Sequence, residues 1–325
     1  MLNTPFSPWP SFSEEEANAV RDVVLSNKVN YWTGQECREF EKEFAEWSGS
    51  KYAVALGNGT LALDLALKAL GISQGDEVIV TPRTFLASVS SVVTAGAAPV
   101  FADVDLNSQN IEATGIEKVL TSKTKAVIVV HLSGMPADMN SIMALSKKHG
   151  FFVIEDCAQA HGAKYKGQPV GSIGHVGAWS FCQDKIMTTG GEGGMVTTND
   201  ENLWKKMWSY KDHGKSWDAI YNKNHPVRWL HESFGTNWRM TEMQAAIGRI
   251  QLRAMHEWTS KRQANAKAID QVAKLSPIVR TVIVPDDIEH AEYKHYIFIR
   301  PEYLKDGWSR DRIVDEINAN GVPCF

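Results

Sequence analysis

The chain has 325 residues, of which 43% are hydrophobic and 22% charged, and a formal net charge of −4 at pH 7, which is typical of a globular protein of two domains. The slightly acidic balance argues against nucleic-acid binding, and no apolar run approaches the ~20 residues of a membrane span. The N-terminus lacks the pattern of a signal peptide, and the four cysteines form no Cys-x-x-Cys pair, so we expect a cytoplasmic protein without a zinc site or disulfide framework.

Apolar, β-branched runs alternate with helical patterns in the first half of the chain. In order, the sequence predicts strand 51–56, helix 61–70, strand 77–80, helix 86–95, and strands 99–104, 126–130 and 151–154. Continuous apolar strands separated by helices indicate a mostly parallel α/β sheet covered on both faces. Ligands bind at the carboxyl ends of such strands, which is where Gly57, Thr84 and Asp156 are expected.

The pattern changes after residue 240. A long helix is predicted over 241–273, followed by strands 280–284 and 295–300 and a helix over 310–320. We therefore expect a large domain over residues 1–240 and a smaller α+β domain over 241–325. The smaller domain has no closing helix and is expected to be incomplete.

The segment Gly57–Thr60 joins a predicted strand to a predicted helix. Backbone N–H groups at a helix N-terminus stabilise anions, which favours a phosphate-binding turn. With Ala62 the turn also matches the Gly-x-Gly-x-x-Ala dinucleotide fingerprint, but that fingerprint needs an acid at the end of the next strand, and here Asp76 and Glu77 begin it. A dinucleotide site and a plain tight turn stay open as alternatives.

Lys185 lies between the apolar segment 179–181 and the glycine-rich loop 190–194. A lysine on such a loop, Ser180 five residues before it and Asp156 after a buried strand are the groups that a pyridoxal 5'-phosphate (PLP) enzyme uses. The lysine would form a Schiff base, the serine would bind phosphate, and the aspartate would keep the pyridine nitrogen protonated. The structural alternatives are a solvated surface side chain for Lys185, a strand-end hydroxyl for Ser180 and a turn cap for Asp156.

Two further residues are assigned to the cofactor. Gln159, three residues after the aspartate, could reach the ring oxygen, and Phe85 could stack on the ring, although a core position is its alternative. Structural roles are expected for His131, His161 and His213.

Several motifs in this order resemble the sugar aminotransferases of the DegT/DnrJ/EryC1/StrS family, which have the aspartate-aminotransferase-like type I PLP fold. The resemblance runs from about Asn3 to the end of the chain, although family members usually continue for several dozen residues. A sister branch has histidine in place of the lysine, and Lys185 argues against it. The motifs are Tyr31-Trp32-Thr33-Gly34, Gly57-Asn58-Gly59-Thr60, Thr84-Phe85-Leu86-Ala87-Ser88, Glu155-Asp156-Cys157-Ala158-Gln159, Ser180-Phe181 with Lys185, and Asn237-Trp238-Arg239-Met240-Thr241-Glu242.

The resemblance implies a homodimer with each active site at the subunit interface. It implies that Gly59, Thr60 and Ser180 bind the cofactor phosphate and that Asn237 reaches the phosphate of the neighbouring subunit. The alternative for Asn237 is a helix cap within its own chain. The other implied contacts are those of Phe85 with the ring, Asp156 with the pyridine nitrogen and Gln159 with the ring hydroxyl.

The implied reaction moves an amino group from an amino acid, usually glutamate, to a nucleotide-linked keto-deoxysugar in lipopolysaccharide, other surface-polysaccharide or deoxysugar biosynthesis. Lys185 and Asp156 would be catalytic, and no metal is expected. Two other classes stay open: an NAD-dependent nucleotide-sugar oxidoreductase that uses the Gly57 turn, and a non-catalytic PLP-binding regulatory protein.

Overall fold

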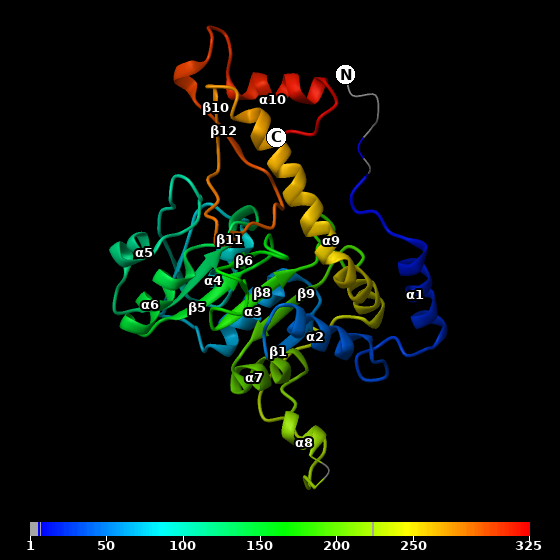
Figure 1. Ribbon diagram of the computed structural model, residues 1–325. Coiled ribbons are helices and arrows are strands. Elements are labelled where there is room, and N and C mark those ends of the chain that lie inside the picture. The colour runs from blue at the N-terminus through cyan, green and yellow to red at the C-terminus, as the bar shows by residue number, and fades with distance from the viewer. Residues whose placement is uncertain (1–5, 7, 223) are drawn as a thin grey trace.

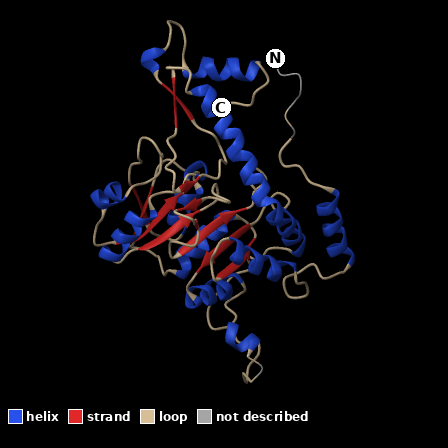
Figure 2. Cartoon of the chain, in the orientation of Figure 1, coloured by secondary structure: helices blue, strands red, loops and turns tan. Residues whose placement is uncertain are grey.

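A computed structural model describes residue 6 and residues 8–222 and 224–325, so the first five residues of the predicted large domain, with Asn3, lie outside the described residues. The centre of the structure is a seven-stranded sheet between layers of helices (Figures 1 and 2). In spatial order its strands are β1 (Tyr52–Leu56), β9 (Gly194–Thr198), β8 (Val176–Ser180), β5 (Phe152–Asp156), β4 (Thr124–Val130), β2 (Glu77–Val80) and β3 (Ala98–Phe101). Only β9 among these runs against its neighbours, which confirms the prediction of a mostly parallel α/β sheet.

Both faces of the sheet are buried, which explains why its strands are continuously apolar. In β4, Ala126 and Ile128 face the layer formed by α3 (Gly59–Ala69), α4 (Ala87–Thr94) and α7 (Glu201–Lys211), whereas Val127 and Val129 face α5 (Ala113–Val119) and α6 (Met139–His149). On this second face, the end of the sheet that contains β1, β9 and β8 packs on α2 (Glu36–Trp47) and α9 (Glu242–Ala273).

Helix α9 runs from the sheet layers to the C-terminal elements (Figure 1). It starts at the N-cap Thr241, whose side chain accepts a hydrogen bond from the Gln244 N–H. The first part of α9 packs on α1 (Glu14–Leu25) and α2, and its end contacts β10 (Val279–Thr281). Strand β10 pairs with β12 (Ile297–Ile299), and α10 (Arg310–Ala319) follows.

The domain boundary predicted at residue 240 stays a prediction. Elements from the two sides of this boundary contact each other. Strand β11 (Ile288–Glu289) pairs with β6 (Lys164–Tyr165), which pairs in turn with β7 (Gln168–Pro169).

Among the described residues, no helix is both long enough and apolar enough to cross a bilayer.

Three predicted strands are too long. The strand predicted over 99–104 ends at Phe101, because Val104 pairs with Ile111 instead. The run 280–284 ends at Thr281, because Ile283 turns away and exchanges hydrogen bonds with the side chain of Asn107. The run 295–300 forms a strand only over Ile297–Ile299.

Candidate functional site

Lys185 lies on the loop between β8 and β9, and helices from elsewhere in the chain hold this loop. The Gln251 side chain on α9 accepts a hydrogen bond from the Thr188 N–H at 2.8 Å and donates one to Glu16 of α1, also at 2.8 Å. The Thr188 hydroxyl donates to the carbonyl oxygen of Phe181 at 2.9 Å. The loop is therefore fixed on both sides of the lysine.

The amine of Lys185 has two polar neighbours. Its Nζ lies 3.4 Å from Asp184 Oδ2 and 3.5 Å from the Tyr293 hydroxyl, and its side chain is 15% exposed. The Tyr293 hydroxyl donates to Asp184 Oδ2 at 2.7 Å. Sequence reasoning missed both neighbours, although Asp184 is adjacent in the chain. Tyr293 is 108 residues away, and no sequence pattern signalled it.

These contacts shift the acidities of both neighbours. Burial acts to raise the pKa of Asp184, but the Tyr293 hydrogen bond and the positive charge of Lys185 outweigh it and lower this pKa. Burial, reinforced by the Asp184 carboxylate, raises the pKa of Tyr293 well above its ordinary value. The pair is therefore a carboxylate that accepts from a neutral phenol.

Asp156, the last residue of β5, is buried at the strand's carboxyl end. Oδ2 accepts from the Ser88 hydroxyl at 2.7 Å, and Oδ1 accepts from the Ala158 N–H at 3.1 Å. Ser88 is held in turn by the Thr84 hydroxyl at 2.8 Å. Burial raises the pKa of Asp156, while these hydrogen bonds act in the opposite direction. Ser88 belongs to a recognised motif, but sequence reasoning assigned it no role in the site.

The predicted phosphate turn packs directly on the end of β8. Asn58 caps α3 by accepting from the Leu61 N–H at 3.0 Å. A Cβ atom on Gly59 would lie 2.8 Å from Ser180 Oγ and 2.9 Å from Ser180 Cα, so this position requires glycine. In the first turn of a helix the N–H groups have no intrahelical acceptor, so those of Gly59 and Thr60 can donate to an anion beside the Ser180 hydroxyl.

Gln159 and Phe85 have different environments. The Gln159 Oε1 accepts from the Ser133 N–H at 2.7 Å, which leaves the amide NH₂ as the group that can donate to a ligand. The Phe85 side chain is 71% exposed, so the core alternative for this residue is wrong.

Asn237 is exposed, and its backbone bridges to Asp212. Its Oδ1 accepts from the Arg239 N–H at 3.4 Å, and within the described part of the chain its side chain forms no hydrogen bond with Gly59, Thr60 or Ser180. The helix-cap alternative for Asn237 is wrong, because Thr241 caps α9.

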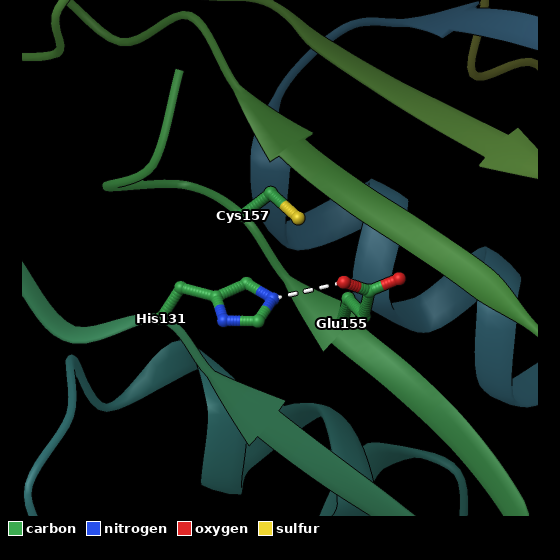
Figure 3. Close-up of side chains that lie close together, drawn as sticks. All are labelled: His131, Glu155 and Cys157. Atoms are coloured by element: carbon green, nitrogen blue, oxygen red, sulfur yellow. Dashed lines mark hydrogen bonds and ion pairs between the residues drawn. The ribbon is translucent and has the colours of Figure 1, made fainter. Parts of the chain in front are cut away.

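His131, Glu155 and Cys157 form a buried cluster next to Asp156 (Figure 3). His131 Nε2 lies 2.9 Å from Glu155 Oε2, and the Ala137 N–H donates to His131 Nδ1 at 3.1 Å, so the ring is the neutral Nε2–H tautomer. The Glu155 carboxylate also accepts three backbone N–H groups, those of Gly171, Ile173 and Gly174. This network accounts for the cluster and confirms the structural role expected for His131.

The other two histidines differ in burial. His161 is fully buried between the rings of Trp179 and Phe181, with neither ring nitrogen hydrogen-bonded to another described side chain. Burial lowers its pKa to about 3, although the backbone of Ser180 acts in the opposite direction, so the ring is neutral. His213 is in the turn between α7 and α8 (Trp217–Tyr221), where its backbone N–H donates to Thr236.

A family model for the DegT/DnrJ/EryC1/StrS aminotransferase family matches residues 10–324. The chain belongs to this family. The aminotransferase of Psychrobacter cryohalolentis superposes with a TM-score of 0.96 at 65% identity, over 99% of this chain and 84% of that chain. The structure of S. venezuelae DesV in complex with a ketimine intermediate superposes with a TM-score of 0.84 at 32% identity, over 95% and 78% of the two chains. GDP-perosamine synthase of Escherichia coli O157:H7 is 42% identical over 258 residues, which are 78% of this chain and 67% of the relative.

The family, the type I fold, the enzyme class and the cofactor are thereby confirmed: the protein is a PLP-dependent aminotransferase. The site residues fit this cofactor. The contact of Gly59 with Ser180 places backbone donors beside a hydroxyl, as a phosphate needs, and Asp156 is a buried carboxylate that a ring cation would complement. The oxidoreductase alternative conflicts with this family, and the similarity to named aminotransferases argues against the non-catalytic alternative.

Proposed function

We propose that the protein transfers an amino group from glutamate to the keto group of a nucleotide-linked deoxysugar. The observation that carries this proposal is the meeting of Lys185, Asp156 and the Gly59–Ser180 contact at one edge of the sheet. The similarity to GDP-perosamine synthase supports a nucleotide sugar as the acceptor. Nucleotide-linked sugars are cytoplasmic metabolites, so we propose the cytoplasm as the place of the reaction.

When bound, PLP supplies an aldehyde that takes up amino groups and a ring that stabilises negative charge at the α-carbon of the amino acid. Lys185 would hold the cofactor through its amine and, once released, carry a proton at that carbon. Asp156 would remain anionic opposite the pyridine nitrogen and keep it protonated. The amide NH₂ of Gln159 would donate to the ring oxygen.

The phosphate would accept hydrogen bonds from the Gly59 and Thr60 N–H groups and from the Ser180 hydroxyl. Hydrogen bonds to a charged group contribute roughly 1.5–3 kcal/mol each, so a few donors hold the cofactor firmly even while Lys185 is released. Phe85, on the loop before α4, would cover one face of the ring.

The proposed reaction is tested with the full chain, PLP and glutamate. We expect an absorption band near the visible edge that glutamate bleaches, followed by an aminated product when nucleotide-linked keto-sugars are screened. A band that no amino donor changes would contradict the proposal, as would an enzyme that aminates only free 2-oxo acids.

We further propose a homodimer in which Asn237 of one chain reaches the cofactor phosphate of the other. Large apolar side chains near this part of the chain are exposed, as an interface requires: Trp229 is 55% exposed and Phe234 is fully exposed. Helix α8 also projects away from the sheet, in the lower part of Figure 1. The Asn237 side chain has no hydrogen-bond partner beyond the Arg239 N–H within the described residues of its own chain.

Mixing two inactive variants tests the shared site. If Lys185 and Asn237 of one site come from different chains, Lys185→Ala and Asn237→Asp chains form mixed dimers with one intact site, and activity reappears on subunit exchange. The acidic side chain repels the phosphate, which makes the second variant inactive by itself. If labelled subunits exchange and activity stays absent, Asn237 does not act across the interface.

A further inference from the structure

A short segment from the C-terminal part of the chain is docked on a turn after β4. The Ala291 N–H donates to the Gly134 carbonyl oxygen at 2.9 Å, and the Tyr293 N–H donates to the Ser133 carbonyl oxygen at 2.9 Å. The Ser133 hydroxyl donates to the carbonyl oxygen of Lys294. Main-chain hydrogen bonds on both sides therefore fix the position of Tyr293.

The turn is shaped for this close approach. Ser133 and Gly134 both have left-handed backbone conformations, with φ of 60° and 96°. A Cβ atom on Gly134 would lie 2.8 Å from the Ala291 Cβ and 3.0 Å from the Gln159 carbonyl oxygen. A left-handed conformation is unfavourable for a non-glycine residue such as Ser133, so the surrounding contacts must maintain it. This docking brings the Tyr293 hydroxyl to Lys185.

The Tyr293 hydroxyl contacts both Asp184 and Lys185, and the two distances show which contact is stronger. Its hydrogen bond to Asp184 is 2.7 Å long, whereas the Lys185 amine is 3.5 Å away. The hydroxyl therefore acts chiefly as a donor to Asp184, which is 3.4 Å from the same amine. By partly screening the carboxylate's charge and occupying Oδ2, this bond weakens the attraction between Asp184 and a protonated lysine.

We propose that Tyr293 is a positioning residue that, through Asp184, keeps the Lys185 amine in the neutral, reactive form at lower pH than Asp184 alone would allow. This inference rests on the proposed function, in which that amine holds the cofactor. A hydroxyl from the C-terminal region thus adjusts the reactivity of a lysine on the sheet edge.

Other titratable groups near Asp184 and Tyr293 affect the Lys185 amine less directly. Within the described part of the chain, Asp184 is the one carboxylate in ion-pair distance of the Lys185 amine. Ser88 and the Ala158 N–H engage the Asp156 carboxylate, and His161 is neutral. The other groups that interact electrostatically with Lys185, Asp184 or Tyr293 are Asp156, His161, Cys182 and Tyr296.

The test measures how fast the cofactor-free full chain captures PLP at a series of pH values, by absorbance. Borohydride reduction and peptide mapping then verify that Lys185 is the labelled residue. Capture requires the neutral amine, so its pH midpoint reports how easily the lysine loses its proton. We expect Tyr293→Phe to move the midpoint to higher pH and Asp184→Asn to move it to lower pH, each by roughly half a unit, because Asp184 is partly exposed and screened.

Two further variants sharpen the test. The double variant Tyr293→Phe/Asp184→Asn should behave like Asp184→Asn, because the tyrosine acts through the aspartate. Tyr296→Phe is the matched control: it removes a hydroxyl from the same segment that forms no hydrogen bond with the described residues, so its midpoint should stay much closer to that of the wild type than the midpoint of Tyr293→Phe does.

The inference is overturned if Tyr293→Phe leaves the midpoint unchanged or shifts it in the same direction as Asp184→Asn. It is also overturned if Asp184→Asn, a change at a partly exposed side chain that should not prevent folding, fails to lower the midpoint. Failure of the wild type to capture PLP at Lys185 is a different result, because it contradicts the proposed function and removes the basis of the inference. Thermal unfolding of each variant establishes that the compared chains are folded.

Discussion

The two sides of the candidate site are held in different ways. Asp156 and Ser180 are buried on strand ends, and Lys185 is fixed through its loop by Gln251. Phe85 and Asn237, in contrast, are exposed. The first side is complete within one chain, whereas the second presents side chains whose proposed partners are a cofactor and a second subunit. Substitutions on the first side should therefore affect chemistry or stability, and those on the second side mainly cofactor retention.

The largest effect is expected for Lys185→Ala on the buried side. Loss of a general base alone typically lowers turnover by about 10²–10⁴-fold, and loss of the covalent link to the cofactor adds to this. Among the described residues, Lys185 belongs to none of the hydrophobic core clusters, so the thermal midpoint should change little. Turnover is measured with glutamate and a nucleotide keto-sugar; wild-type activity without an added amine would refute the assignment of Lys185.

A second substitution tests what supports the buried side. Glu155→Gln replaces a buried carboxylate that accepts from His131 and three backbone N–H groups, and its amide NH₂ would face at least one of these donors. We expect a loss of roughly 2–4 kcal/mol in the free energy of unfolding at pH 7, measured with denaturant.

The pH dependence of this loss follows from the acidity of Glu155. Burial acts to raise its pKa, but the hydrogen bonds from His131 and the backbone outweigh burial and lower it in the folded state. Its stabilisation is therefore present above the ordinary carboxyl pKa of 4.5 and is lost as the pH falls through the folded-state value. The difference between wild type and variant should narrow in acid; a difference that widens would contradict an ionised Glu155.

The smallest effect is expected on the exposed side. Phe85→Ala should weaken cofactor retention by about 3–10-fold, because aromatic stacking contributes roughly 0.5–1.5 kcal/mol. Leu86→Ala is the matched control, since the adjacent leucine is 69% exposed and has no proposed contact with the cofactor. Equal PLP affinity in the two variants, measured by equilibrium dialysis, would remove Phe85 from the site. The thermal midpoint of both variants should stay near that of the wild type.

Much of the sheet could be predicted because strands buried on both faces are continuously apolar, as β4 and β5 are. Strands β8 and β9 were not predicted, because Gly177, Ser180 and Thr197 interrupt their apolar runs. Helix α2 was missed although its buried residues Cys37, Phe40 and Phe44 recur at helical spacing. For β8 and β9, short-range patterns failed because the strands are buried by tertiary contacts although their sequences are not continuously apolar.

By itself, the sequence predicted the candidate lysine, the serine and aspartate assigned to the same site and the glycine turn, because each is tied to a local pattern: a strand end, a helix N-terminus or a flexible loop. Only the tertiary structure brought Ser88 to Asp156 and Tyr293 to Asp184, across 68 and 109 residues. Contacts at such separations depend on how whole elements pack, and a hydroxyl that donates one hydrogen bond leaves no periodic signal in the chain. The structure also decided that Asn237 does not cap α9, because the backbone conformation at Thr241 selects the capping residue.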